Sequence, residues 1–97
     1  MNIPIETKLK AFKRCLGRCQ GCFKELAFPC KFAFRIRPTR KNISLYGEVV
    51  LSDHLNLMPV CGNRECEKSV NIEKSPLAIR DLIVSMAKAA SSKQRGE

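Results

Sequence analysis

Two segments near the ends of the chain carry apolar residues at the spacing of an amphipathic helix. The first covers residues 4–16, and Gly17 after it suits a C-terminal cap. The second covers residues 76–90, where Ser75 and Pro76 are typical of an N-cap and the first helical position. We therefore predict a helix in each segment.

The apolar face of the first helix is expected to be core and to consist of Ile5, Leu9, Phe12 and Leu16. The second helix has a wider apolar face, made of Leu77, Ile79, Leu82, Ile83, Met86 and Ala90. We expect this face to be core, and a homodimer or protein partner docked on residues 76–90 is the alternative. The tail, residues 91–97, is expected to be mobile.

Between the helices, alternating residues predict a β-hairpin. Apolar and cationic side chains alternate over residues 31–37, which indicates a half-buried strand with a cationic outer face. Residues 38–42 form a turn-like basic loop, and the apolar segment 43–51 predicts the second strand. The phenylalanines of the first strand are assigned to its core face, so stacking of nucleic-acid bases on them is not expected. A further short helix is expected to begin in or just after residues 61–66 and to run towards residue 72.

Four of the six cysteines form two close pairs, and these pairs are the strongest chemical signal in the chain. Cys19 and Cys22 are separated by two residues, Cys61 and Cys66 by four, and 38 residues lie between the pairs. Zinc prefers four soft ligands at tetrahedral corners, and each short pair supplies one edge of the tetrahedron. We predict a structural zinc site with these four cysteines as ligands.

Three alternatives to this site remain open at the level of sequence. A local set of Cys15, Cys19, Cys22 and Cys30 has four ligands but leaves the second pair unused. His54, the single histidine, is a candidate to replace one cysteine. Three disulfides, with 15 possible pairings, would suit an exported protein. Because the N-terminus lacks the apolar stretch of a signal peptide, we expect reduced thiols in an intracellular compartment, the cytoplasm or nucleus.

The net charge of +9 is placed unevenly. Residues 1–41 hold 11 Lys/Arg against 2 Asp/Glu, whereas residues 42–97 hold 7 of each sign. Zinc bound to four thiolates would lower the total to +7 and leave the first half basic. A one-sided basic field predicts a polyanionic partner, and we expect nucleic acid, DNA ahead of RNA, with no membrane contact. The plainer interpretation is a solvated basic face that aids solubility.

A chain of 97 residues suits a single domain of α+β class. The predicted order is a helix, a cysteine knuckle, a hairpin, and a second cysteine pair leading into a helix. This is the order of a small treble-clef, or ββα, zinc domain with added N-terminal and C-terminal helices. The treble-clef core is expected over residues 18–72, with the C-terminal helix over residues 76–90.

Part of this core resembles the HNH nuclease family. The stretch from Asn56 to Cys61, followed by Cys66, is similar to the family signature Asn-Leu-x-x-x-Cys…Cys-His. The segment Arg35–Pro38 lies where that family usually has His-Ile-x-Pro. The resemblance covers about half of the chain. It implies a zinc-bound framework that presents a hairpin to nucleic acid.

The residues that this resemblance would make catalytic are largely replaced. The general-base histidine of the family corresponds to Arg35, and the histidine that ligates the catalytic cation corresponds to Glu67. A further metal-ligand position corresponds to Phe34, and only the middle asparagine is matched, by Asn56. Arginine stays protonated at neutral pH, and phosphodiester hydrolysis needs both a base and a hard cation. We therefore expect the chain to lack nuclease activity.

A rearranged active site is the alternative. Its candidate residues are His54, Asn56 and Glu67, with Mg²⁺ or Mn²⁺ as the catalytic cation. A structural or interaction subunit is the third interpretation. The favoured one is a non-catalytic nucleic-acid-binding zinc domain. Its expected phosphate contacts are Lys8, Lys13, Arg14, Arg18, Arg35, Arg37, Arg40 and Lys41.

Overall fold

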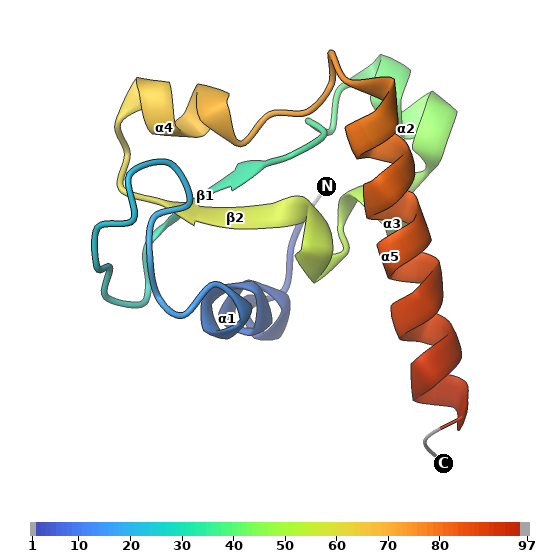
Figure 1. Ribbon diagram of the computed structural model, residues 1–97, viewed down its shortest axis with the longest axis horizontal. Helices are drawn as coiled ribbons and strands as arrows, with labels where there is room; N and C mark the ends of the chain where they lie inside the picture. The colour runs from blue at the N-terminus through green and yellow to red at the C-terminus, as the bar shows by residue number, and fades with distance from the viewer. Residues whose placement is uncertain (1, 96–97) are drawn as a thin grey trace.

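The structure is a computed structural model that describes the backbone of residues 2–95 and the side chains of residues 2–90. The described residues form several helices around one two-stranded antiparallel sheet, so the predicted α+β class is confirmed (Figure 1). The elements are α1 (Ile5–Arg14), β1 (Lys31–Phe34), α2 (Arg40–Tyr46), α3 (Glu48–Leu51), the 3-10 helix η1 (His54–Asn56), β2 (Leu57–Val60), α4 (Arg64–Ser69) and α5 (Pro76–Arg95). Among the described residues, no helix is both long and apolar enough to cross a bilayer.

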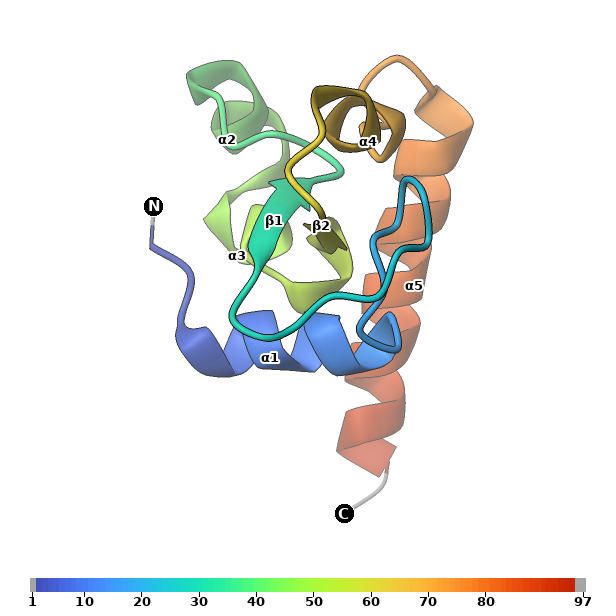
Figure 2. The ribbon, with the colours of Figure 1, turned by 90° about the vertical axis from the view of Figure 1, so that its left-hand side faces the viewer.

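A two-stranded antiparallel sheet lies at the centre of the molecule. β1 pairs with β2 in a register that sets Lys31 opposite Val60 and Phe34 opposite Leu57. The sheet lies between α1 on one side and α4 on the other, while α5 passes its end (Figures 1 and 2). Each face of the sheet is therefore covered by a different helix.

The prediction of a strand over residues 43–51 is wrong, because this segment forms α2 and α3. The Thr39 side chain caps α2 by accepting a hydrogen bond from the Asn42 N–H at 3.2 Å. Gly47, at φ +86°, ends the helix and leads into α3. Local capping at both ends favours the helix, and the strand that pairs with β1 is instead Leu57–Val60, outside the predicted hairpin.

Both terminal helices are confirmed, but α1 buries a different face from the predicted one. Ala11 is fully buried, whereas Ile5 and Leu16 of the predicted stripe are largely exposed. α1 rests on β2 and η1, and Ala11 is small enough for close approach to them. The prediction that Ile5 and Leu16 belong to the core is therefore wrong.

Buried side chains form two small clusters. One surrounds the cysteines and contains Cys19, Val60, Cys66 and Val70. The other contains Ile36, Leu51 and Leu82, with Ile79 and Met86 of α5 packed against it. The predicted core role of α5 is confirmed at these positions, while Leu77 and Val84 are exposed.

A partner for α5 stays a prediction. Of the predicted tail, residues 91–95 continue α5, and residues 96–97 lie outside the described part.

Phe32 and Phe34 do not belong to either cluster, contrary to their assignment to the core face of the strand. Ala33, between them, packs against the cysteine cluster. Because successive side chains in a strand point to opposite faces, the two phenylalanines lie on the face of β1 turned away from that cluster, where Phe28 links Phe32 to Phe12 of α1. Ile36 is buried, but it lies beyond the end of the strand and outside this alternation.

Asn56 joins three segments from a fully buried position. Its Oδ1 accepts from the Ile36 N–H at 2.8 Å, and its Nδ2 donates to the carbonyls of Ile36 and Leu51, each at 2.9 Å. These bonds hold the end of β1 against α3 and η1. Buried backbone groups need such partners, so this amide stabilises the long connection between the strands.

Replacing Asn56 is expected to destabilise the fold strongly. Asn56→Ala would leave three backbone groups without partners, and we expect the free energy of unfolding to fall by at least about 3 kcal/mol. Denaturant unfolding followed by circular dichroism measures this change. The matched control is Asn63→Ala at the exposed N-cap of α4, where about 1 kcal/mol is expected. Equal losses in the two variants would contradict the bracing role.

Candidate functional site

The four cysteines of the two predicted pairs come together in space. The sulfur atoms of Cys19, Cys22, Cys61 and Cys66 all lie within 4.8 Å of one another. Cys22 Sγ is 3.9 Å from Cys61 Sγ, which is 3.8 Å from Cys66 Sγ. A tetrahedral zinc site with Zn–S bonds of about 2.3 Å separates its sulfurs by about 3.8 Å. The geometry therefore fits a structural zinc ion, and these four residues would hold it.

The first pair lies in a tight knuckle stabilised by its own backbone. The Phe23 N–H donates to the Cys19 carbonyl at 2.8 Å, and Phe23 adopts a left-handed conformation at φ +64°. Gly21 N donates to Cys19 Sγ at 3.4 Å. A Cβ added at Gly21 would lie 2.4 Å from Cys66 Cβ, so only glycine lets the knuckle approach α4 this closely.

The second pair joins the end of β2 to α4. Cys61 follows the strand, Gly62 turns the chain at φ +95°, and Asn63 caps α4 by accepting from the Glu65 N–H. Cys66 lies in the first turns of α4 and is buried, as is Cys19. One metal ion would thus tie the knuckle, β2 and α4 to one another.

The cluster favours one thiolate and resists further ionisation. Burial opposes ionisation of Cys19, but hydrogen bonds from the backbone of Cys22, Gly21 and Cys61 outweigh it and lower its pKa to about 6. Burial raises the pKa of Cys66 to about 12, and hydrogen bonds with the neighbouring thiols add to the rise. A divalent cation would supply the positive charge that four adjacent thiolates need.

The alternative ligand sets are not assembled. All six cysteines, which lie in the described part of the chain, are free thiols rather than disulfides. Cys15 and Cys30 lie outside the four-sulfur cluster, and so does His54. Arg14 instead binds His54: its Nη1 lies 3.1 Å from His54 Nδ1 and also donates to the His54 carbonyl. Arg14 Nη2 donates to the Leu57 carbonyl at 2.8 Å, so this arginine holds α1 against β2.

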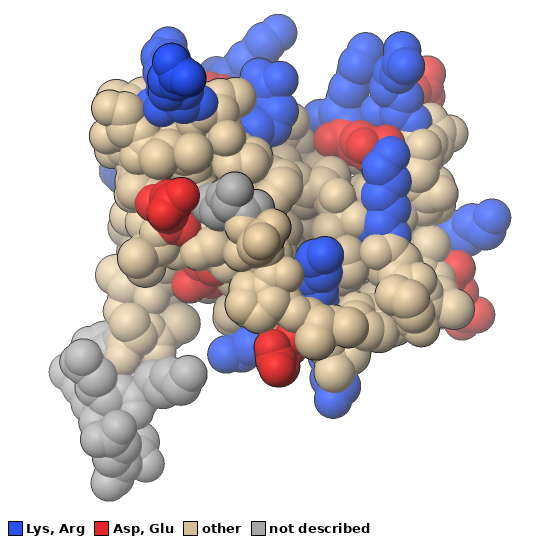
Figure 3. Space-filling view, turned by 180° about the vertical axis from the view of Figure 1, so that it is seen from behind, with Lys and Arg blue, Asp and Glu red and all other residues tan. Residues whose placement is uncertain are grey.

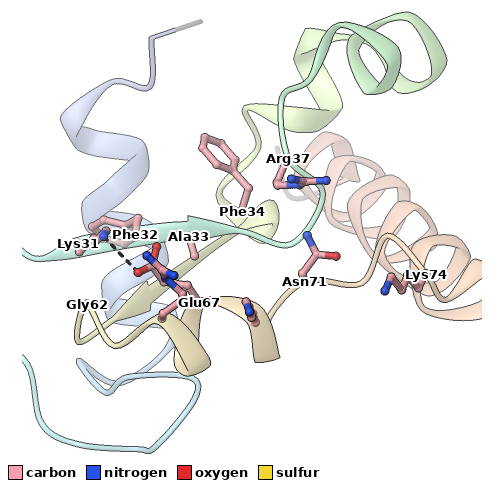
Figure 4. A pocket seen from close by; sticks show the side chains of 11 residues that line it. Lys31, Phe32, Ala33, Phe34, Arg37, Gly62, Glu67, Asn71 and Lys74 are labelled. Atoms are coloured by element: carbon pink, nitrogen blue, oxygen red, sulfur yellow. Dashed lines mark ion pairs between the residues drawn. The ribbon is translucent and has the colours of Figure 1, made fainter.

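A basic groove of about 950 Å³ runs between β1 and α4 (Figure 4). Five cationic side chains line it, against the single carboxylate of Glu67. The cations are Lys31, Arg37, Arg64, Lys68 and Lys74. Figure 3 shows Lys and Arg side chains gathered along the upper edge of the molecule, over α2 and α4. We call the groove lined by these five cations the β1–α4 groove.

Of the five cations that line the β1–α4 groove, two are neutralised by ion pairs and three are not. Lys31 Nζ is paired with Glu67 at 3.1 Å, and Arg37 Nε with Glu73 at 2.6 Å. The other three, Arg64, Lys68 and Lys74, form no ion pair with any described side chain. The groove therefore offers unneutralised positive charge from α4 and from the loop after it.

The predicted phosphate-binding residues are dispersed, and several have structural partners. Arg14 is bonded to His54 and Leu57, and Arg18 to Glu25 and the Phe23 carbonyl. Arg37 alone of the predicted set lines the β1–α4 groove; Lys8, Lys13, Arg35, Arg40 and Lys41 do not. Arg35 is half-buried, and its burial, with Arg14 nearby, lowers its pKa.

Three groove cations were missed because Arg64, Lys68 and Lys74 lie in the half of the chain without net charge. When charge is summed over residues 42–97, these three cations are cancelled by acidic residues of the same half. The helical spacing of Arg64 and Lys68, four residues apart, was the one signal that could have placed them on a single face. Of the three residues of the rearranged active site, Glu67 lines the groove, while His54 and Asn56 do not.

Comparison with protein-family models, with curated proteins and with solved structures finds no match for this chain. The cysteine cluster makes the chain a candidate zinc-binding domain on its own geometry.

Removing one cluster cysteine is expected to remove the metal and destabilise the fold. We expect one zinc ion per chain in the parent protein and less than stoichiometric zinc in Cys66→Ser. Bound zinc at a thousandfold excess over its Kd would stabilise the fold by about 4 kcal/mol. Metal analysis and thermal unfolding with and without a chelator measure both effects.

The control for this experiment is Cys30→Ser, because Cys30 is half-buried and outside the cluster. It should keep its zinc and its chelator sensitivity. Loss of metal in Cys30→Ser together with retention in Cys66→Ser would instead support the local set of Cys15, Cys19, Cys22 and Cys30.

Glu73 is expected to make the fold sensitive to acid. Its hydrogen bonds to Arg37 lower its pKa to about 2; burial opposes this, and donors from Asn71 and Asn42 assist. A carboxyl whose pKa is depressed on folding stabilises the fold above its unfolded pKa of 4.5 and loses that contribution as the pH falls towards 2.

The measurement is the free energy of unfolding of the parent and of Glu73→Gln between pH 6 and pH 2. The difference between them should shrink as the pH falls through this window. Protonation of the cysteine cluster occurs in both proteins and cancels in the difference. A difference that stays constant with pH would contradict the assignment. Glu25→Gln, at an exposed ion pair, is the matched control.

Proposed function

We propose that this protein is a zinc-stabilised domain that binds the phosphate backbone of nucleic acid in the β1–α4 groove without cutting it. The observation that carries this proposal is the five-to-one excess of cationic over acidic side chains around one groove. Phosphate contacts supply most of the sequence-independent affinity of proteins for nucleic acid.

The charges that remain free define where a phosphate would lie. Glu67 and Glu73 offset Lys31 and Arg37, so the attraction comes chiefly from Arg64, Lys68 and Lys74. Arg64 suits bidentate contact with phosphate, and the two lysines act as mobile point charges. Such contacts give affinity and orientation rather than sequence specificity.

The metal site has a defined part in this function. Cys66 lies in α4 between Arg64 and Lys68, and Cys61 directly follows β2, the strand that pairs with β1. Zinc bound to them would fix α4 relative to β1 and so fix the width of the groove. It would supply no chemistry beyond this structural constraint.

Binding without hydrolysis follows from the residues at the positions that resemble HNH catalytic sites. Arg35 cannot act as a base at neutral pH even though its burial lowers its pKa. Glu67 is paired with Lys31, which competes with a cation for its carboxylate. His54 accepts a hydrogen bond from Arg14 and does not line the groove.

The test reverses charge in the groove. Lys68→Glu combined with Lys74→Glu is expected to weaken binding to duplex DNA by at least about tenfold at low salt. Loss of two phosphate contacts should also reduce the slope of log K against log salt by about 2. Fluorescence anisotropy at several salt concentrations measures both quantities. The matched control is Lys10→Glu with Lys24→Glu, at exposed positions outside the groove.

Equal affinity of the groove variant and the parent would overturn the proposal. The absence of hydrolysis is tested separately, by incubating supercoiled plasmid with Mg²⁺ or Mn²⁺. Nicking by the parent that disappears in His54→Ala would show a rearranged nuclease and contradict the non-catalytic assignment.

A further inference from the structure

Phe34 lines two hollows that β1 separates. One is the β1–α4 groove, and the other is a hollow of about 460 Å³ between β1 and the N-terminal segment. Lys8, Lys31 and Phe32 also line this second hollow. In Figure 4 the Phe34 ring stands on the far side of β1 from Glu67. A half-buried aromatic ring thus lies between two sets of cations.

Phe34 differs from the neighbouring phenylalanines because its ring packs against no other ring in the described part of the chain. Phe12 and Phe28 meet edge to face with centroids 5.4 Å apart, and Phe28 meets Phe32 in the same way at 6.5 Å. Among the described residues, Phe34 has no ring partner and belongs to neither core cluster. Its ring is therefore not needed to complete the aromatic packing beside α1.

The surroundings of Phe34 match the two chemical parts of a nucleotide. An apolar ring face suits a base. Lys8 in one hollow and Lys68 in the other, neither of them in an ion pair with a described side chain, suit the adjoining phosphates. In a duplex the bases are stacked on one another and offer only their edges and the backbone. A single strand, by contrast, can turn a base onto an exposed aromatic ring.

We propose that Phe34 is a stacking platform for an unpaired base, so that the preferred ligand of the groove is single-stranded nucleic acid. This inference rests on the proposed function, because the phosphates on either side of the stacked base would lie on the groove cations. It reverses the expectation, drawn from the strand pattern, that these phenylalanines are core.

The experiment compares Phe34→Leu with Phe34→Tyr. Leucine keeps an apolar side chain but cannot stack, whereas tyrosine keeps the ring. For a single-stranded oligonucleotide, Phe34→Leu should weaken binding by at least about fivefold, and Phe34→Tyr should stay within about twofold of the parent. Duplex affinity and the salt dependence should be unchanged in both. Zinc content and thermal unfolding check that the variants are folded.

A second measurement removes single bases from the oligonucleotide and compares the loss of affinity with that in Phe34→Leu. Single abasic sites are placed in turn along the oligonucleotide, and one position is expected to weaken binding to the parent as much as Phe34→Leu does. Combining that abasic site with Phe34→Leu should add no further loss, since the same contact is already absent. Matched DNA and RNA oligonucleotides separate the two sources of unpaired bases.

The possible failures are distinguishable. If Lys68→Glu with Lys74→Glu weakens binding but Phe34→Leu does not, and no abasic position matters, the stacking proposal is wrong and the groove stands. If neither variant changes affinity, or the parent binds no oligonucleotide at all, both proposals are wrong. Equal losses for duplex and single strand in Phe34→Leu would also overturn stacking.

Discussion

Four thiols from three separate segments of the chain meet at one point, and their convergence sets how these segments are arranged. Cys19 and Cys22 come from the knuckle after α1, Cys61 from the end of β2, and Cys66 from α4. No two of these segments are held together by an extensive apolar core, because the surrounding cluster contains only a few buried side chains. A small domain with so little buried apolar surface gains from a cross-link, and a metal ion bound by the four cysteines would supply one.

At the opposite end of the sheet, side-chain hydrogen bonds rather than thiols join segments that are distant in sequence. Asn56 satisfies backbone groups of Ile36 and Leu51, and Glu73 joins Arg37 to Asn42 and Asn71. The Ile72 N–H also donates to the Arg35 carbonyl at 2.9 Å. These bonds attach the loop before α5 to the end of β1. This attachment lies directly before α5, which contributes Leu82 to the second apolar cluster.

The groove lies between these two anchors, and its width depends on both. The thiol cluster positions α4, which carries Arg64 and Lys68. The Glu73 bridges position the loop that carries Lys74 and also hold Arg37 at the other margin. Surface charges are easily displaced by water and salt, so a binding surface gains from a rigid frame. The proposed function therefore depends on interactions that lie outside the groove itself.

Local patterns of residues were enough to predict several features of this protein. The cysteine spacing identified the four residues that cluster, helical periodicity located α1 and α5, and alternation located β1. The predicted cap at Ser75 is confirmed, whereas α1 ends at Arg14 with Cys15, not Gly17, as its C-cap. Capping by Thr39 and Gly47 could also have been recognised locally, and it would have prevented the assignment of residues 43–51 to a strand. Tertiary structure was needed for what depends on partners distant in sequence: the pairing of β1 with residues 57–60, the position of Phe34 outside both apolar clusters, and the groove shared by Lys31 and Lys68. These features follow from which segments meet in space. That is set by the thiol cluster and the Asn56 and Glu73 bridges, whose members lie up to 47 residues apart, from Cys19 to Cys66. The cysteine spacing marks the first of these, but no local pattern shows which other segments they bring together.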